Sequence, residues 1–487
     1  MEYKAESRNL PKPYFDRASS TRTLCIIGLS LSWMVALLSL AVGVPSSVRS
    51  REVVFSTPIS FELVILGQNI LITVCNESLG FIHSVSLRWA LQREGRLAFN
   101  SNLRLFTSSR TSKPNKWYSN VVVLCGIVVT YASSSLTFLL INKRNSSDGF
   151  VFRICGQAFV TLGCGVAAQA SIATWSLARS NPPTWSSVFL DTAAVSFSAD
   201  PGLEHRPGRS LQGVHSSASP AGQAYAQRRQ PSAYSAHKEL RHVLWLTWLC
   251  VILSSTWSAA LLIAFVSKAK NSMAAACWTL LPGSGCTPAL NLPWEDALAQ
   301  KNLPIGDFCW TFLLICAIQV ALTLTLHCTE LQVSCSRDET LWRKAASKKG
   351  FNRDTNAFTL MLTSWQSISL FFFKAVLHWL YGLSMVVYIR NGPITGLSFY
   401  APQTCSLTAG IALLGIFSTT IMFWRHKGPQ PVTFGHLQTL VDLIDYWPPD
   451  RDGDRMYWGD KGDEAGVAHA GTSWMPLASI RFDTRYA

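Results

Sequence analysis

Long apolar runs recur along the chain, and their lengths predict helices that cross a membrane. A hydrocarbon core about 30 Å thick needs about 20 consecutive apolar residues. Eight runs reach that length, at residues 24–44, 61–85, 119–141, 153–177, 242–266, 308–328, 362–389 and 404–424. The pattern predicts an all-α fold, a polytopic bundle of about eight transmembrane helices.

The polar segments between these runs divide the chain into five parts. A polar N-terminal segment, 1–23, precedes spans one to four within 24–178. The loop 179–241 separates them from spans five to eight within 242–424, and a polar tail, 425–487, follows. Much of the long loop is Ser, Ala, Gly and Pro, which cannot bury a core, so this loop is predicted to be disordered.

The positive charges predict the orientation of the chain. With eight spans, 32 of the 42 Lys and Arg residues fall on the side of the termini and nine on the opposite side. Basic residues stay on the cytosolic side of a membrane, so both termini are expected there, in the plasma membrane or an endomembrane. The formal charge of +14 is explained by this bias and by attraction to anionic lipids, and no motif indicates nucleic-acid binding.

Two cytosolic segments have amphipathic patterns. In the loop 86–117, leucines and aromatic residues alternate with arginines, which predicts a basic arm resting on the anionic leaflet. In the tail, an amphipathic helix is expected to end at Pro448 and to dock on the bundle or the membrane. Its apolar face comprises Phe434, Leu437, Leu440, Val441 and Ile444.

Polar residues inside the second run lie on one helical face. They are spaced by four, three, four and three residues, and Glu77 borders the face they form. A one-sided stripe is typical of a spanning helix whose polar face meets other helices. The stripe consists of Asn69, Thr73, Asn76, Gly80 and His83.

The seventh run has a similar stripe, with Lys374, His378 and Tyr381 on one face. Charged groups inside a membrane are costly unless they are paired. We therefore expect Glu77 and Lys374 to pair inside the bundle. Such a pair is either part of an ion or proton pathway or a structural ion pair that fixes helix register.

The number of spans depends on the run 61–85. If this segment lay on the membrane surface, seven spans would remain and the N-terminus would be outside. That topology would indicate a receptor-like sensor. The one-sided stripe favours spanning and eight helices.

The remaining chemistry is sparse. Most of the 13 cysteines lie in apolar runs, and no cluster has metal-ligand spacing. Cys277 and Cys286 flank turn residues and would form a disulfide if their loop faced an oxidising compartment. No nucleotide, hydrolase or metalloprotease motif is present, so we expect no enzyme activity, cofactor or metal. No internal repeat is obvious in the sequence, which argues against a standard secondary-transporter fold.

Several segments resemble a family of uncharacterised multi-pass membrane proteins of filamentous fungi. They are "SLRWALQREGRLAFNSNLRLF", "NPPTWSS", "FGHLQTLVDLID", "MYWGDKG" and "HAGTS". The resemblance implies a fungal source and a helical bundle with a cytosolic tail, and it implies no activity. From the residues, we expect a non-enzymatic membrane protein that translocates an ion or solute, or organises the membrane, through a buried polar centre.

Overall fold

The structure is a computed structural model that confirms a multi-pass helical bundle. Eight of its helices are long and apolar enough to cross a membrane. It describes residues 19–49, 51–55, 58–141, 150–199, 202–271, 278, 280, 287–293, 305–352, 363–389, 394–447, 455–464 and 467–487. The eight helices are α1 (Ser19–Val48), α2 (Pro58–Arg93), α3 (Trp117–Ser134), α4 (Gly156–Arg179), α6 (Lys238–Asn271), α7 (Ile305–Trp342), α9 (Trp365–Ser384) and α10 (Ala401–Phe423).

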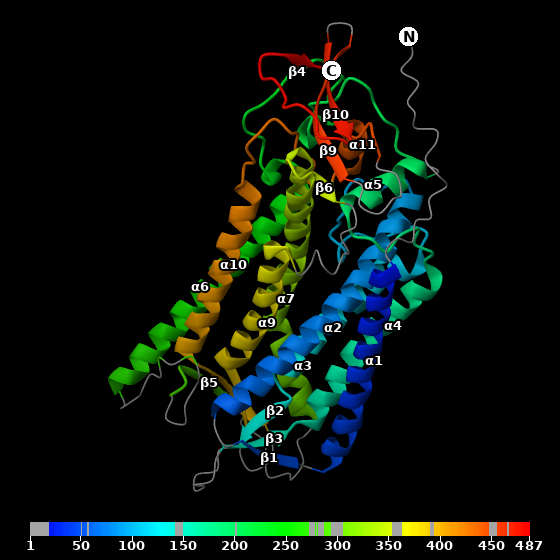
Figure 1. Cartoon of the computed structure of the whole chain (residues 1–487). Coiled ribbons are helices and arrows are strands. Elements are labelled where there is room, and N and C mark those ends of the chain that lie inside the picture. The colour runs from blue at the N-terminus through cyan, green and yellow to red at the C-terminus, as the bar shows by residue number, and fades with distance from the viewer. Residues whose placement is uncertain are drawn as a thin grey trace.

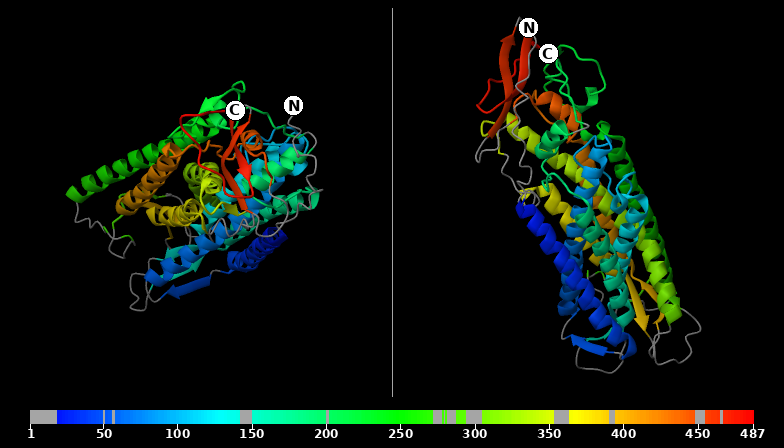
Figure 2. Two further views of the ribbon diagram at one scale, coloured as in Figure 1. Left: turned by 45° about the horizontal axis from the view of Figure 1, so that its top comes forward. Right: turned by 90° about the vertical axis from the view of Figure 1, so that its right-hand side faces the viewer.

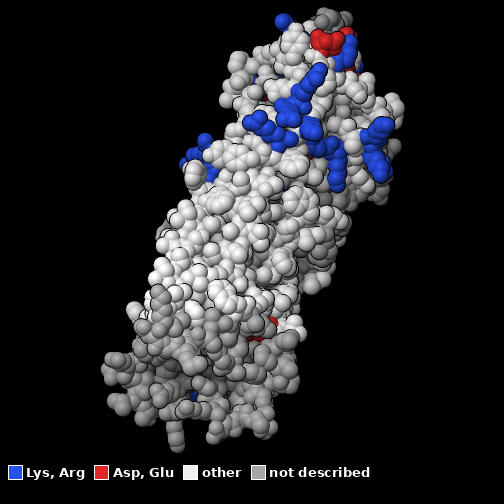
Figure 3. All heavy atoms as spheres, turned by 90° about the vertical axis from the view of Figure 1, so that its left-hand side faces the viewer, with Lys and Arg blue, Asp and Glu red and all other residues white. Residues whose placement is uncertain are grey.

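The two ends of the bundle differ (Figure 1). One end carries the C-terminal tail and is called the tail end below; the other, the far end, carries a six-stranded sheet. Lys and Arg side chains gather at the tail end, and a broad band beside it shows almost no charge (Figure 3). A charge-free band of this kind is the surface that a lipid bilayer covers.

The six-stranded sheet corrects the prediction of an all-α fold. Its order is β1-β3-β2-β7-β8-β5. The apolar runs 119–141 and 362–389 were both predicted as helical to their ends, but each finishes as a strand. Apolar β-branched and aromatic residues there continue the hydropathy of the helix while favouring strand. The strands are β1 (Arg51–Phe55), β2 (Phe138–Ile141), β3 (Phe150–Ile154), β5 (Leu290–Pro293), β7 (Met385–Ile389) and β8 (Ile394–Phe399).

All four far-end connections contribute to this one sheet. The connections α1–α2 and α6–α7 each supply one strand, and α3–α4 and α9–α10 each supply a pair. The parallel pair of β2 and β7, with Leu140 opposite Tyr388, joins the first four helices to the last four. The sheet therefore ties the two halves of the bundle together at the far end.

The two halves have the same order of elements, although no internal repeat is obvious in the sequence. The order helix, strand, helix, helix, strand, strand, helix occurs from α1 to α4 and again from α6 to α10, where the two-residue strand β6 (Phe351–Asn352) is inserted between α7 and α9. Both halves begin at the tail end and so have the same orientation (Figure 1). In α1 and α6 the repeat is visible in the residues: Trp33 and Trp257 are each followed, after two residues, by Ala-Leu-Leu.

The second helix of each half shares a longer pattern. Glu77 on α2 stands two residues after a cysteine and 12 before Trp89, and Glu330 on α7 has the same spacing to Trp342. Both tryptophans are fully buried. Their indole nitrogens donate to carbonyl oxygens in the segments that follow α4 and α10, at Thr184 (2.9 Å) and Pro431 (2.8 Å). Glu77 and Glu330 are therefore equivalent positions of the repeat.

The halves meet along their inner helices. α2 contacts α9, and α3 contacts α7, so each half presents the same two helices to the other. The equivalent helices α1 and α6 lie at opposite edges of the bundle (Figures 1 and 2). α2 thus lies inside the bundle, between α1, α3, α4 and α9, and not in the surface position that the seven-span alternative requires.

The tail end is a compact layer built from separated segments (Figure 2). α5 (Phe189–Ser198) packs against α11 (Leu437–Leu443). α11 is the tail helix expected from the sequence, although it stops well before Pro448. A five-stranded sheet lies beside them in the order β4-β11-β10-β9-β6. Its strands are β4 (Ala224–Tyr225), β6 (Phe351–Asn352), β9 (Arg455–Glu464), β10 (Val467–Ser473) and β11 (Arg485–Tyr486).

The segment 86–117 differs from the surface arm predicted for it. α2 continues to Arg93, and Leu87 and Leu91 are buried in the core of the tail layer. Arg88 is buried too and donates from Nη1 to the Ser186 carbonyl at 2.9 Å. Arg88 and Arg104 are buried with these leucines, whereas Arg93, Arg96 and Arg110 are exposed. The apolar residues of this segment therefore face protein, which a sequence cannot distinguish from a lipid surface.

The described part of the loop 179–241 has a defined course in place of the predicted disorder. The Val214 amide donates to the Val432 carbonyl at 2.9 Å. Arg206 forms an ion pair with Asp442 at 2.5 Å. The loop is ordered by the tail, so its composition alone does not reveal the contacts that hold it.

Candidate functional site

Glu77 and Lys374, which the sequence predicts as a pair, lie in contact between the two halves. The Lys374 ammonium donates from Nζ to Glu77 Oε1 and also to Oε1 of Glu330. The Lys374 side chain is almost fully buried, and it bridges α2 of the first half to α7 of the second through α9. The two repeat-equivalent carboxylates therefore converge on one ammonium group.

Arg104 and His327 complete the site. Arg104 Nε lies 3.2 Å from Glu330 Oε2, and His327 Nδ1 lies 2.8 Å from Glu330 Oε1. Arg104 Nη2 is also 3.2 Å from His327 Nδ1. These five residues, Glu77, Arg104, His327, Glu330 and Lys374, are called the charged cluster below. With a neutral imidazole, its two carboxylates balance its two cations, as a buried set of charges requires.

The carboxylates of the charged cluster are more accessible than its cations. The side chains of Glu77 and Glu330 are 27% and 24% exposed, whereas those of Lys374 and Arg104 are 1% and 5% exposed. Part of each acid's surface therefore lies outside the packed interior, while the basic groups are enclosed.

Gly80 makes room for Arg104. A Cβ built on Gly80 would lie 1.9 Å from Arg104 Nη1. Gly80 belongs to the polar stripe of α2, and its contribution to that stripe is space for a guanidinium group.

Glu94 holds the loop that carries Arg104. Glu94 Oε1 accepts hydrogen bonds from the Ser109 hydroxyl at 2.6 Å, the Arg110 amide at 2.7 Å and the Thr111 amide at 2.8 Å. Burial acts to raise the pKa of Glu94, but hydrogen bonds from Ser109 and Thr111 outweigh it and lower the pKa to about 2. An ionised carboxylate thus fixes the loop at neutral pH.

A layer of neutral polar groups lies beside the charged cluster. The rings of Tyr131 and His378 stack with centroids 3.5 Å apart and planes 9° from parallel. Gln319 Nε2 lies 3.0 Å from His378 Nδ1. His378 is one turn from Lys374 on α9, and the centroids of the Tyr131 and His327 rings are 6.3 Å apart, so these rings connect the polar layer to the charged cluster.

The polar stripe of α2 extends this layer toward the far end. The hydroxyls of Thr73 and Tyr131 are 3.2 Å apart. The Ser134 hydroxyl donates to Asn69 Oδ1 at 3.2 Å. The Thr137 hydroxyl, next to β2, donates to Gln68 Oε1 at 3.2 Å.

Asn76, predicted as part of the centre, forms a hydrogen bond within the first half. Its Oδ1 accepts from Gln169 Nε2 of α4 at 3.1 Å. Gln169 also donates to the Thr130 hydroxyl at 3.0 Å, and the aliphatic part of its side chain contacts Gly126. Asn76 therefore joins three helices of one repeat.

His83 and Tyr381 lie outside the charged cluster. His83 is buried, and neither of its ring nitrogens has a hydrogen-bond partner among the described residues. The Tyr381 hydroxyl donates to the Ile315 carbonyl at 3.1 Å and so joins α9 to α7. Cys277 and Cys286, predicted as a disulfide, lie outside the described residues.

Three members of the charged cluster have the donor atoms of a metal site. Ligand atoms of Glu77, His327 and Glu330 lie within 4.8 Å of one another. Lys374 Nζ already occupies the position between the two carboxylates. A metal ion could bind there only after Lys374 had moved away.

Sequence reasoning missed Arg104, His327 and Glu330. The apolar pattern ends the sixth run at residue 328 and so predicts that Glu330 lies in a cytosolic loop, whereas α7 continues to Trp342. One sequence signal does indicate Glu330. The spacing of Cys328, Glu330 and Trp342 is the same as that of Cys75, Glu77 and Trp89. No comparable signal marks Arg104, because a loop brings it into the bundle.

In comparisons with known proteins, no family model, no curated protein and no solved structure matches the chain.

Proposed function

We propose that the protein moves protons or another small cation across a membrane through the charged cluster. The observation that carries the proposal is that Glu77 and Glu330, equivalent in the two repeats, share the ammonium of Lys374 at the interface between the halves. Transporters built from repeats place their sites at such an interface, near the middle of the membrane. Intramembrane carboxylates and histidines mark proton and ion routes.

The polar layer supplies a path on one side of the cluster. From His378 and Tyr131 it passes Thr73, Asn69 and Ser134 and reaches Thr137 at the edge of the far-end sheet. On the other side, Arg104 belongs to a loop of the tail end. Polar groups therefore run from the tail end to the far end through the centre of the bundle.

The charged cluster has two states, one with both acids ionised and one with a proton or cation bound to an acid. When Glu77 or Glu330 takes up a proton or a cation, the acid no longer neutralises Lys374, and the buried ammonium becomes an uncompensated charge. The free-energy cost of this buried, unpaired ammonium falls if α9 moves Lys374 away from α2 or α7. Binding of a cation is thereby coupled to the relative position of the two halves.

The test is proton flux through the purified protein in liposomes that contain a pH-sensitive dye. A potassium diffusion potential drives the flux. We expect flux above that of empty liposomes, reduced at least tenfold by Glu77→Gln and by Glu330→Gln. The matched control is Glu62→Gln: Glu62 is also on α2 but accepts from Trp379 Nε1 at 3.0 Å, outside the cluster.

Two outcomes would overturn the proposal. One is the absence of flux when protons, sodium and potassium are each tested, which would leave a structural role for the cluster in organising the membrane-embedded fold. The other is an equal loss of flux in Glu62→Gln, because the effect would then not depend on the charged cluster.

A further inference from the structure

Two segments at the tail end place two cations directly opposite each other. Arg229 and Lys427 form an antiparallel bridge. It is flanked by hydrogen bonds from the Gln230 amide to the His426 carbonyl (2.9 Å) and from the Gly428 amide to the Arg228 carbonyl (3.1 Å). In this pattern the paired residues point to the same side with Cβ atoms about 4.5–5.5 Å apart, and like charges so placed are destabilising.

No acidic partner relieves this repulsion in the described part of the chain. Arg229 and Lys427 are both exposed, and neither forms an ion pair with a described residue. Exposed Arg425, two residues before Lys427, adds a third charge. Arg228 precedes Arg229 in the extended segment and points to the other side, where its guanidinium lies over the Phe482 ring at 5.6 Å. Three residues, Arg229, Arg425 and Lys427, are called the cationic patch. A fold that holds them together favours an anionic ligand.

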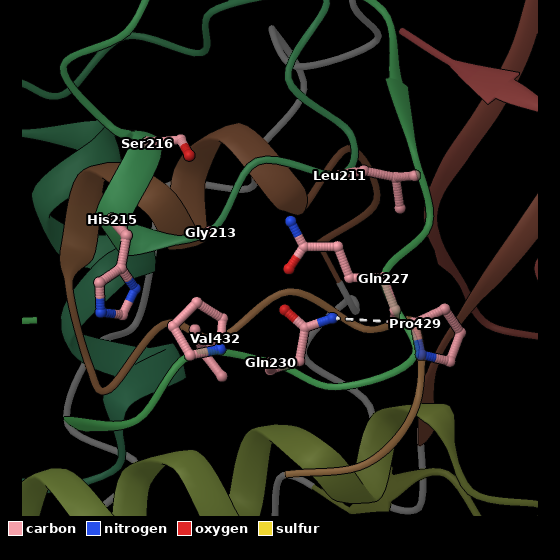
Figure 4. A pocket seen from close by; sticks show the side chains of 9 residues that line it. Leu211, Gly213, His215, Ser216, Gln227, Gln230, Pro429 and Val432 are labelled. Carbon is pink, nitrogen blue, oxygen red and sulfur yellow. Dashed lines mark hydrogen bonds between the residues drawn. The ribbon is translucent and has the colours of Figure 1, made fainter. Parts of the chain in front are cut away.

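A small pocket opens between the same two segments (Figure 4). Gln227, Gln230 and Pro429, which flank the patch residues in sequence, line it, together with His215 and Ser216. The Gln230 side-chain amide is already hydrogen-bonded within the protein, because its Nε2 donates to the Gly428 carbonyl at 3.1 Å. The Gln227 amide points into the space in the close-up view and forms no hydrogen bond with another described side chain. The pocket therefore offers neutral polar groups beside the cationic patch.

The patch lies where a membrane surface meets the bundle. Arg425 and Lys427 follow the end of α10 at Phe423. The side chains of Phe423 and Trp424 are 51% and 60% exposed, and Trp245 on the neighbouring α6 is 66% exposed. Exposed tryptophans at helix ends mark the level of lipid headgroups.

We propose that the cationic patch binds the phosphate of an anionic phospholipid, with the headgroup lying over the mouth of the adjoining pocket. The phosphate takes the position between Arg229 and Lys427, where a negative charge removes their repulsion. Arg425 contacts the same phosphate as a charge-assisted donor. The exposed aromatic residues at the ends of α6 and α10 contact the acyl chains. This site is separate from the charged cluster and does not depend on transport.

The experiment measures binding of fluorescent short-chain lipids to the purified full-length protein in a neutral detergent. The probes are phosphatidylinositol 4-phosphate, phosphatidylserine and phosphatidylcholine. We expect both anionic probes to bind and the zwitterionic one not to bind. Arg229→Gln with Lys427→Gln should weaken anionic binding at least tenfold, since each basic residue at an anionic surface contributes about 1 kcal/mol.

The control removes the same charge elsewhere on the tail end. Arg110 and Lys113 are exposed on the loop 94–116, and Arg110→Gln with Lys113→Gln should change binding less than twofold. An equal loss in both double variants, or no loss in the first, would overturn the proposal. Equally tight binding of soluble inositol phosphate would overturn the assignment to a lipid. Unchanged melting temperatures show that the variants are folded.

Discussion

Arg104 occupies the space beside α2 that Gly80 leaves free, and a methyl group at that position would lie 1.9 Å from its Nη1 atom. Gly80→Ala therefore forces the guanidinium group away from Glu330. Overpacking of this kind costs about 1–3 kcal/mol. We expect a lower apparent melting temperature in detergent, together with release of the loop 94–116 to limited proteolysis.

The control for this variant lies on the same helix. A Cβ on Gly67 would meet nothing within 4 Å. Gly67→Ala should leave the melting temperature unchanged or raise it slightly, since alanine is favoured over glycine in a helix by up to about 1 kcal/mol. If both variants melt alike, Gly80 has no special role in seating Arg104.

Replacing Lys374 alone should reduce the stability of the protein more than replacing Lys374 and Glu77 together. Lys374→Met leaves Glu77 without an ion-pair partner among the described residues, while Glu330 keeps Arg104. Breaking a buried pair costs about 3–5 kcal/mol, and removing both partners restores part of that. We expect Glu77→Gln to recover stability when added to Lys374→Met, measured as a coupling energy in a double-mutant cycle. Additive losses would contradict the pairing.

Exchange of the two charges is a poor test of this pair. Lys374→Glu would place its new carboxylate against Glu330, so Glu77→Lys cannot compensate for it. Adding Glu330→Gln removes the clash. The triple variant should therefore be more stable than the double exchange, which is checked by comparing their melting temperatures at one pH.

The contact of Glu77 with Lys374 could be expected from the sequence because both residues lie on polar faces of apolar runs. Each face needs partners inside the bundle, and opposite charges at similar depth satisfy one another. Glu330 was not predicted because polar residues beyond Cys328 end the apolar run while the helix continues. Helix length there is set by packing of Trp342 in the tail layer, which hydropathy does not report.

The strands at the far end were missed for a related reason. Met385–Ile389 is as apolar as the helix before it, so the run reads as one span. Its strand character comes from pairing with Ile394–Phe399, which begins only a few residues later. The repeat was missed because few residues are shared, and it emerges from the order of helices and strands.

Glu339 fixes the start of the tail to α7, the helix that carries Glu330. Its Oε2 accepts from the Thr433 amide at 2.8 Å and the Phe434 amide at 3.0 Å. Phe434 has a φ of 46°, a left-handed conformation that needs such support. We expect Glu339→Gln to increase hydrogen exchange across 430–445. The exposed Glu204→Gln is the control and should leave exchange there unchanged; equal exchange in both variants would contradict the role of Glu339.

Asp445 and His469 make the tail sheet sensitive to pH. Asp445 Oδ2 lies 3.1 Å from His469 Nε2 and 2.6 Å from Lys461 Nζ, and Oδ1 accepts from the Thr472 amide at 2.6 Å. Burial acts to raise the pKa of Asp445, but hydrogen bonds from His469, Lys461 and Thr472 outweigh it and hold the pKa below its usual range.

The bond to Asp445 raises the pKa of His469 above its usual value of 6.5, with burial acting against it and the Ala487 carbonyl acting with it. A raised folded-state pKa means that the stabilisation is complete below about 6.5 and is lost as pH rises through the higher value. We therefore expect β10 to exchange amide hydrogens faster at pH 9 than at pH 6, after correction for intrinsic rates. His469→Gln should remove this difference, because glutamine carries no proton to lose. A difference that persisted in His469→Gln would assign the pH dependence to another group.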